Sequence, residues 1–420
     1  MAIKYISKKK HLAAIFTAIT IIAVIISACN DLPTSISSSL LLDTIAVKPL
    51  TSRDTTIITS SNSFIYRIQI FNSGTMFLGK YDDVKGLAMI RFSEIPDTLG
   101  NLTVDDIDSA TLYIPLLSYA LGDSNNTTSL SFKVYKIIKL WTNETNWDSL
   151  FTSGSISDYF DYSKVIGTFN GTIIQNDTAM ATLSIPLDKN LMIEWFRLQK
   201  DTDSAKTIYG IALIPDENSN VIRTLSAQTV SENRTHPYIS VTYKLNNNQY
   251  TSIMNSAIDA SCTNADPPET NSLTVQGGVS DRFNLTFDLS MIPDEAAIHA
   301  AEIEFTFDTT GSYAGNFGFD STLDAKLFYD STNQTNYIEY YGFRLNPTSN
   351  IYQFPSITSA IQYFIRHGKK GKLTFMPGTF QTEYRQLDRM KFFNIDAADT
   401  TKRPVLRIIY STRPKIRCQP

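Results

Sequence analysis

The sequence predicts an all-β protein with two tandem antiparallel β-sandwich domains, jelly-roll-like in architecture, after a lipoprotein signal peptide. Three observations predict this fold: short segments of alternating apolar residues, turn clusters between them, and an internal repeat. Ser, Thr and Asn are abundant in the 420 residues, while 19% of residues are charged and the formal net charge is −4. Because this charge is nearly balanced, we expect no nucleic-acid partner.

The N-terminus has the charged, apolar and small-residue order of a secretory signal. Lysines precede an apolar core at residues 12–26, which is too short as a helix to cross a hydrocarbon layer of about 30 Å. Ser27 and Ala28 then lead to Cys29, and this arrangement resembles the lipobox of bacterial lipoproteins. The resemblance implies cleavage before Cys29 and a membrane anchor on its thiol; the alternative is an uncleaved signal anchor with an incidental cysteine. Asn30, rather than Asp, favours the outer membrane, on the cell surface or the periplasmic face.

Segments with alternating aromatic and β-branched residues predict strands along most of the remaining chain. These segments are residues 63–71, 86–92, 110–117, 129–138, 207–215 and 238–244. Clusters of Gly, Asp, Ser and Asn at 122–128 and 216–220 predict turns between them. Residues 187–199 break the pattern and predict a short helix across a sandwich end.

The chain also repeats itself. Residues 87–96 are echoed at 282–293, and the closing segments 236–243 and 403–410 match at nearly equal spacing from their helix-like neighbours. The repeat predicts the following parts: signal peptide 1–28, tether leading into a first strand 29–62, first sandwich 63–245, linker 246–272, second sandwich 273–412 and tail 413–420. In this linear order the second sandwich would lie farthest from the anchor.

The repeated unit resembles the DNRLRE-type domain, a family of exported bacterial β-sandwiches related to carbohydrate-binding modules. The resemblance is carried by residues 90–92, 95–96 and 110–112, by Trp141 and Trp147, by Trp195, and by residues 210–213 and 237–243. It implies a non-catalytic sandwich on a secreted or surface protein. The second copy departs from the pattern, because it has no tryptophan pair and Tyr363 replaces Trp195.

Two sets of residues are candidate ligand contacts. Trp141 and Trp147 flank a polar turn and can form a sugar-binding platform; alternatively, both pack against the sandwich. A basic turn is formed by Arg366, Lys369, Lys370 and Lys372. Cationic side chains bind carboxylates and sulfates, so this turn suits an acidic polysaccharide, although it can also be a solvated face.

With Cys29 lipidated, Cys262 and Cys418 are left either to form a disulfide or to stay free. No metal-ligand spacing, phosphate-binding loop or nucleophile elbow is present, so we expect no metal, no cofactor and no enzyme activity. A pair of glycosidase carboxylates is the remaining enzymatic alternative. The expected function is non-catalytic polysaccharide binding by an outer-membrane lipoprotein. The main alternative is a structural, adhesin or envelope-assembly protein whose sandwiches are spacers.

Overall fold

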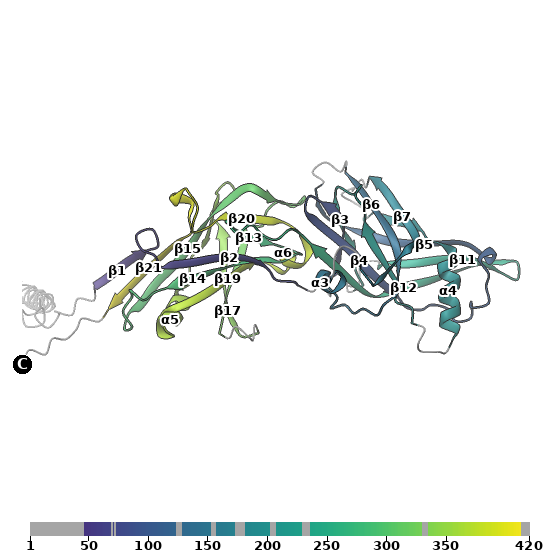
Figure 1. Cartoon of the computed structure of the whole chain (residues 1–420), viewed down its shortest axis with the longest axis horizontal. Helices are drawn as coiled ribbons and strands as arrows, with labels where there is room; N and C mark the ends of the chain where they lie inside the picture. Colours follow the sequence, from purple (N-terminus) through teal and green to yellow (C-terminus); the bar gives the residue numbers. More distant parts are fainter. Residues whose placement is uncertain are drawn as a thin grey trace, which may run out of the picture.

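The computed structural model describes residues 46–412 except 69, 71–72, 123–127, 153–156, 173–180, 202–206, 229–235 and 330–334. Cys29 and Cys418 lie outside the described residues. The predicted all-β fold is confirmed: two sheet systems follow one another along the longest axis of the molecule, and every strand pairing is antiparallel (Figure 1). In this described part, no helix has the length and apolarity needed to cross a membrane.

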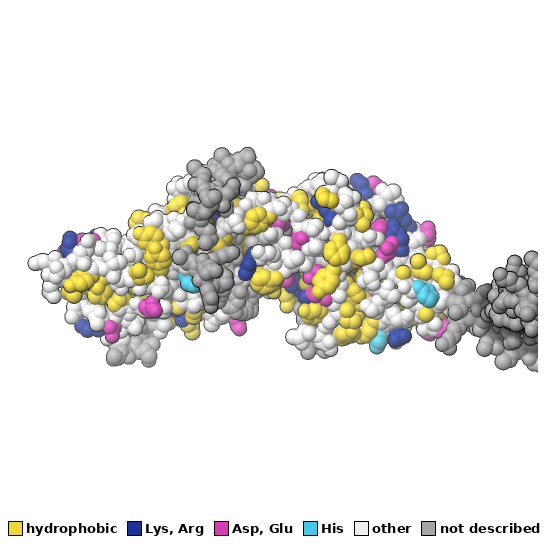
Figure 2. Space-filling model, turned by 180° about the vertical axis from the view of Figure 1, so that it is seen from behind, with side chains coloured by type: hydrophobic (Ala, Val, Ile, Leu, Met, Phe, Trp, Pro, Cys, Tyr) yellow, Lys and Arg dark blue, Asp and Glu magenta, His cyan; other side chains and the backbone are white. Residues whose placement is uncertain are grey.

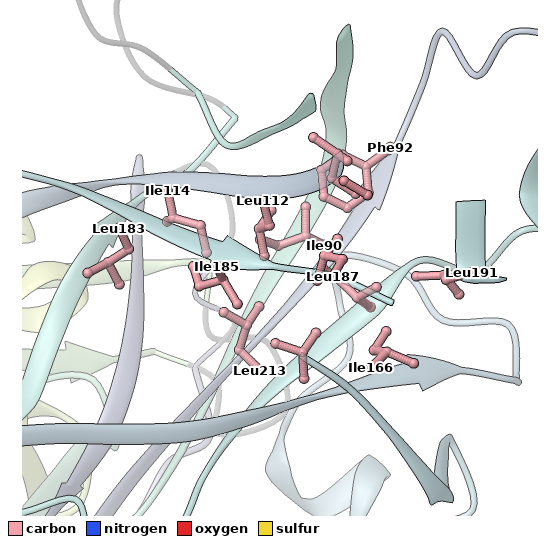
Figure 3. Close-up of a cluster of buried hydrophobic side chains, with 14 of the residues drawn as sticks. Ile90, Phe92, Leu112, Ile114, Ile166, Leu183, Ile185, Leu187, Leu191 and Leu213 are labelled. Carbon is pink, nitrogen blue, oxygen red and sulfur yellow. The ribbon is translucent and has the colours of Figure 1, made fainter. Parts of the chain in front are cut away.

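The first sheet system contains ten strands and one helix of three turns. Its strands are β3 (Thr75–Tyr81), β4 (Val84–Phe92), β5 (Ile107–Leu121), β6 (Ser129–Ile137), β7 (Phe160–Thr172), β8 (Thr182–Pro186), β9 (Ile211–Pro215), β10 (Ile222–Ser226), β11 (Tyr238–Leu245) and β12 (Asn248–Asn264). Its helices are α3 (Trp147–Leu150), α4 (Lys189–Lys200) and the 3-10 turn η1 (Val104–Asp106). Ile90, Leu112 and Leu213 lie in its core, in the same buried cluster as Leu191 of α4 (Figure 3).

The second sheet system contains eleven strands. They are β1 (Ala46–Thr51), β2 (Ile58–Ile65), β13 (Ser272–Gln276), β14 (Asp281–Asp288), β15 (Ala297–Tyr313), β16 (Thr322–Phe328), β17 (Tyr337–Arg344), β18 (Ile351–Phe354), β19 (Lys370–Pro377), β20 (Arg389–Phe393) and β21 (Val405–Thr412). Its helices are α5 (Thr358–Arg366), α6 (Phe380–Arg385) and the 3-10 turn η2 (Thr400–Lys402). The core is rich in aromatic rings; Phe283 and Phe375 stack with their centroids 4.8 Å apart, and Phe305 meets Phe375 edge-on.

The two systems share one pattern of strand pairing. β4 pairs with β3, β9 and β12, and β14 pairs with β13, β19 and β2. The long strand β5 pairs with β11 and then β10, as β15 pairs with β21 and then β20. The helices α4 and α5 stand at matching places, before β9 and β19. The internal repeat of the sequence is therefore also a repeat of topology.

The repeats exchange the strands that complete them. β1 pairs with β21, and β2 pairs with β14, so both N-terminal strands belong to the second system. In the first system, β12 takes both of these places, because it pairs with β11 and with β4. Each repeat is thus completed by strands that come before the other repeat in the chain. β12 comes before the second repeat and completes the first, whereas β1 and β2 come before the first repeat and complete the second.

This exchange changes the expected division of the chain. The segment 29–62, expected as a tether leading into a first strand, contains β1 and most of β2. These strands belong to the second system and not to the first, because Ile57 and Ile58 are buried in the second core. The expected linker 246–272 is mostly β12, which buries Met254 and Ala260. The described chain begins at β1, beside β21 at the outer end of the second system, so the first system lies farther from the start of the described chain (Figure 1).

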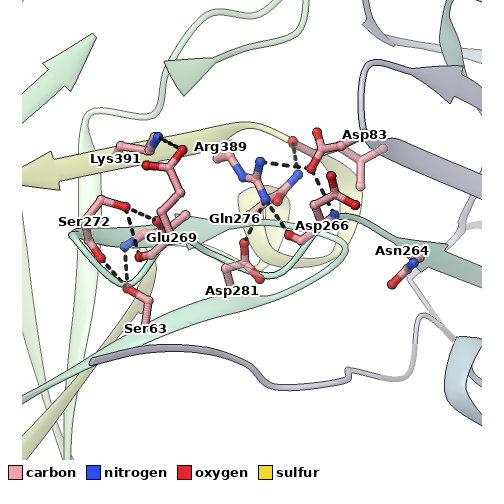
Figure 4. A network of polar contacts seen from close by, with 12 residues as sticks. Ser63, Asp83, Asn264, Asp266, Glu269, Ser272, Gln276, Asp281, Arg389 and Lys391 are labelled. Atoms are coloured by element: carbon pink, nitrogen blue, oxygen red, sulfur yellow. Dashed lines mark hydrogen bonds and ion pairs between the residues drawn. The ribbon is translucent and has the colours of Figure 1, made fainter. Parts of the chain in front are cut away.

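Apolar and polar contacts join the two systems. A buried cluster at their junction includes Phe77 and Tyr119 of the first system and Leu387 of the second. The Tyr119 hydroxyl donates a hydrogen bond to the Asp388 carboxylate at 2.8 Å. Arg389 donates from Nη1 to the Asp83 carboxylate at 3.0 Å (Figure 4). The junction is therefore a packed interface with a buried polar network.

Candidate functional site

A groove of about 380 Å³ lies on the outer surface of the second system. This volume falls within the usual range for small-molecule sites, roughly 300–1,000 Å³. Six aromatic side chains line it: Phe64, Tyr66, Phe328, Tyr329, Tyr363 and Phe364. Figure 2 shows that hydrophobic and charged side chains are neighbours over much of one face of the molecule, and the groove combines both kinds at one place.

The floor of the groove comes from the outward positions of neighbouring strands. Successive side chains of a strand point to opposite faces, so Arg282 and Asn284 of β14 face outward while Phe283 faces the core. Asn284 lies opposite Thr374 of β19, and the Thr374 hydroxyl donates to the Asn284 side-chain oxygen at 2.7 Å. β2 adds Phe64 directly beside Arg282.

The rim is formed where α5 passes into β19. Gly371 allows this close approach, because a Cβ at that position would lie 2.0 Å from the ring of Phe364. Tyr363 of α5 stacks on His367 at 3.9 Å and meets Tyr329 edge-on at 5.2 Å between centroids. The rim therefore holds an ordered aromatic wall.

Three cationic side chains complete the lining, Arg282, Lys370 and Lys372, and the His367 ring lies beside them; no described lining residue is acidic. Arg282 is held by Glu383 at 2.6 Å, and its guanidinium lies 4.0 Å from the centre of the Tyr66 ring. Lys370 lies 3.8 Å from Asp288 and is largely exposed. Within the described part of the chain, Lys372 is exposed and has no ion-pair partner. The groove can therefore offer positive charge to an anionic ligand.

The matching face of the first system is closed. The sequence repeat places Leu87 and Met89 of β4 where Arg282 and Asn284 stand in β14. The segment between β6 and β7 covers this apolar face. The buried cluster between this cover and the sheet consists of Leu87, Met89, Ile137, Trp141, Leu150, Phe160, Ala212, Ala260 and Cys262. The second repeat has a polar face at this place, with a groove instead of the tryptophan-bearing cover.

Trp141, a candidate sugar platform, is 2% exposed. Its indole nitrogen donates a hydrogen bond to the Tyr209 carbonyl oxygen at 2.7 Å, and the Arg91 guanidinium lies 5.5 Å from the ring centre. Trp147 is half-buried and packs against Phe151 at 4.5 Å between ring centroids. The geometry of both rings thus corresponds to the packing alternative, and neither lies at the groove.

We expect Trp141→Ala to lower the free energy of unfolding by about 3–5 kcal/mol, because it opens a cavity under the cover of the first system. Urea unfolding followed by circular dichroism measures this change. Tyr250→Ala is a suitable control, since Tyr250 is 45% exposed, and it should cost less than about 1 kcal/mol. Equal effects of the two substitutions would contradict a structural role for Trp141.

The basic turn divides into two pairs. Lys370 and Lys372 line the groove, whereas Arg366 and Lys369 do not. Lys369 has a positive φ of 64°, and its ammonium pairs with Asp294 at 2.7 Å. The aromatic residues that line the groove were not predicted from the sequence. The available signal was the replacement of Leu87 and Met89 in the first repeat by polar residues at the matching positions of the second, which indicates an uncovered face.

Cys262 is buried under the cover of the first system and has no disulfide partner among the described residues. Its Sγ donates to the Thr145 carbonyl oxygen at 3.4 Å, and burial raises the pKa of the thiol to about 12. Its expected partner, Cys418, lies outside the described residues, so a bridge between them stays a prediction. Across the described ranges, no three His, Cys, Asp or Glu side chains are grouped to hold a metal ion.

The fold and the groove define an all-β, antiparallel protein with an aromatic and cationic surface site. No family model and no curated protein matches the chain. A solved structure titled BspA_C_WT is 8% identical, with a TM-score of 0.14, over 81% of this chain and 90% of that one. A likeness at this score carries no argument about fold or function.

Proposed function

We propose that this protein is an outer-membrane lipoprotein that binds polysaccharide without cleaving it, and that the groove of the second system is the binding site. The observation that supports this proposal most is the lining of the groove, where the exposed ring of Tyr329 and several half-buried aromatic rings adjoin the exposed ammonium groups of Lys370 and Lys372. Flat rings offer apolar area to the faces of sugar rings, and polar neighbours orient the hydroxyl groups. A proposed anchor on Cys29 would hold the second system near the membrane, since the described chain begins at β1.

The charge of the groove favours an acidic polysaccharide. Lys372 has no acidic partner among the described residues, and Lys370 is only loosely paired with Asp288. Hydrogen bonds to charged groups are stronger than neutral ones, and charge attraction between exposed groups weakens with salt. Binding should therefore fall as ionic strength rises.

The test uses residues 31–420 in gels that contain polygalacturonate, chondroitin sulfate, carboxymethyl cellulose, xylan or laminarin. We expect retardation by at least one acidic polymer, and about tenfold weaker binding after Tyr329→Ala combined with Lys372→Ala, equivalent to about 1.4 kcal/mol. The control combines Tyr250→Ala with Lys133→Ala, which removes an exposed tyrosine and an exposed lysine from the first system.

Two results would contradict the proposal. One is free migration of the wild-type protein in all five gels. The other is equal retardation of the groove variant and the wild type. The alternative role, as a spacer or adhesin, is supported by the exchanged strands, which join the two systems. It predicts that the wild-type protein migrates freely in all five gels.

A further inference from the structure

A row of exposed aromatic side chains follows β17, next to the groove. Tyr337, Tyr341 and Phe343 are 41%, 54% and 50% exposed. They stand at odd-numbered positions, so they share one face of the strand with Glu339. We call these three rings the β17 strip.

The β17 strip is continuous with the groove. Phe328, which lines the groove, lies opposite Tyr337 across the β16–β17 ladder, and the centroids of their rings are 5.8 Å apart. Lys326 lies opposite Glu339, and its ammonium contacts both the Glu339 carboxylate at 3.2 Å and the Tyr337 ring at 4.3 Å from its centre. No gap in the sheet separates the groove from the strip.

Polar groups hold two rings of the strip, Tyr337 and Tyr341, in place. The Tyr341 hydroxyl donates a hydrogen bond to the Glu339 carboxylate at 2.6 Å. Lys326 and Glu339 pair between the rings of Tyr337 and Tyr341, where they can also meet hydroxyl groups of a ligand. Exposed apolar groups with a polar rim mark interaction surfaces, and the held rings lose little freedom on binding.

The shape of the strip selects the kind of ligand. Alternate residues of a strand are about 6.6 Å apart, so the run from Tyr337 to Phe343 spans roughly 20 Å. This surface is one strand wide, whereas a stable protein–protein interface needs about 800 Å² on each partner. A narrow, linear chain that crosses from the groove onto β17 fits these dimensions.

We infer that the β17 strip extends the groove, so that the site takes a linear polysaccharide along several sugar units and not only at a chain end. This inference rests on the proposed function. The groove holds the charged part of the chain through Lys370 and Lys372, and the strip stacks on the sugar rings that follow.

The test compares a strip variant, Tyr341→Ala with Phe343→Ala, with the groove variant described above, in the same gels. Both strip residues are at least half exposed, so the double substitution should leave urea unfolding nearly unchanged. We expect about tenfold weaker retardation by the full-length polymer that the wild type binds. Short fragments from hydrolysis of the same polymer should bind the strip variant and the wild type equally in a competition assay.

A matched control combines Tyr250→Ala with Ile253→Ala, which removes two exposed apolar side chains of β12. Unchanged retardation of the strip variant, together with weaker retardation of the groove variant, would overturn the extension and leave the proposed function standing. Equal losses of short fragments and full polymer would also overturn it. If no polymer retards the wild type, both proposals fail together.

Discussion

Deletion of residues 46–65 should unfold the second sheet system while the first keeps its protected core. The deletion removes β1 and β2, leaves β21 and β14 without these partners, and takes Ile57 and Ile58 out of the second core. Hydrogen exchange measured by mass spectrometry should show rapid exchange in peptides of β14, and slow exchange in peptides of β4. The expected loss is large because two ladders and two buried side chains disappear at once.

A point substitution separates this effect from a general effect of truncation. Ile57 is completely buried, so Ile57→Ala should cost about 2–5 kcal/mol, with faster exchange again confined to the second system. Loss of protection in β4 and β11 instead, with β14 unaffected, would mean that the N-terminal strands belong to the first system.

Asp281→Asn should be more stabilising at pH 8 than at pH 4. The change in the free energy of unfolding that it causes should differ by roughly 3–4 kcal/mol between these two pH values. Asp281 is fully buried in the junction network, where burial raises the pKa of its carboxyl from 3.8 to about 7, against the opposing effect of Arg389 (Figure 4). At pH values between these two pKa values, the Asp281 carboxyl keeps its proton in the folded protein and has released it in the unfolded chain. Stability from this group is therefore full below pH 4 and is lost as the pH rises through 7.

Urea unfolding at several pH values measures this difference between variant and wild type. Asp54→Asn, at an exposed turn, serves as the control for the removal of a surface carboxylate. A constant difference for Asp281→Asn would show that the carboxyl does not change its charge on unfolding in this window.

Much of the fold could be predicted from local patterns. Alternation of apolar residues located most of the expected strands, although the segment 63–71 overlaps β2 only at residues 63–65. The expected helix at 187–199 is α4, and its N-cap residue Asp188 accepts a hydrogen bond from the Asn190 amide. The partners of β2 and β12 could not be predicted in this way. Strand pairing depends on contacts between distant segments, and the order of the repeats along the chain suggested a simple division instead.

The candidate site was predicted only in part. Lys370 and Lys372 were found because like charges cluster in the sequence, and both line the groove. Phe64 and Arg282 become neighbours only through the pairing of β2 with β14, so no local pattern connects them. Trp141 was a candidate because tryptophan is rare in this chain. Its low exposure results from the way the segment between β6 and β7 packs on the sheet, and no local sequence pattern predicts that packing.

The exchanged strands also determine how mechanical tension passes through the molecule. Under the proposed function, the membrane anchor precedes β1 and the polymer lies on the second system. A pull on the polymer then loads the β1–β21 and β2–β14 ladders along the strand direction. In that geometry many hydrogen bonds must break together, rather than one after another. The force is carried by the second system alone, and the first system remains outside the load path.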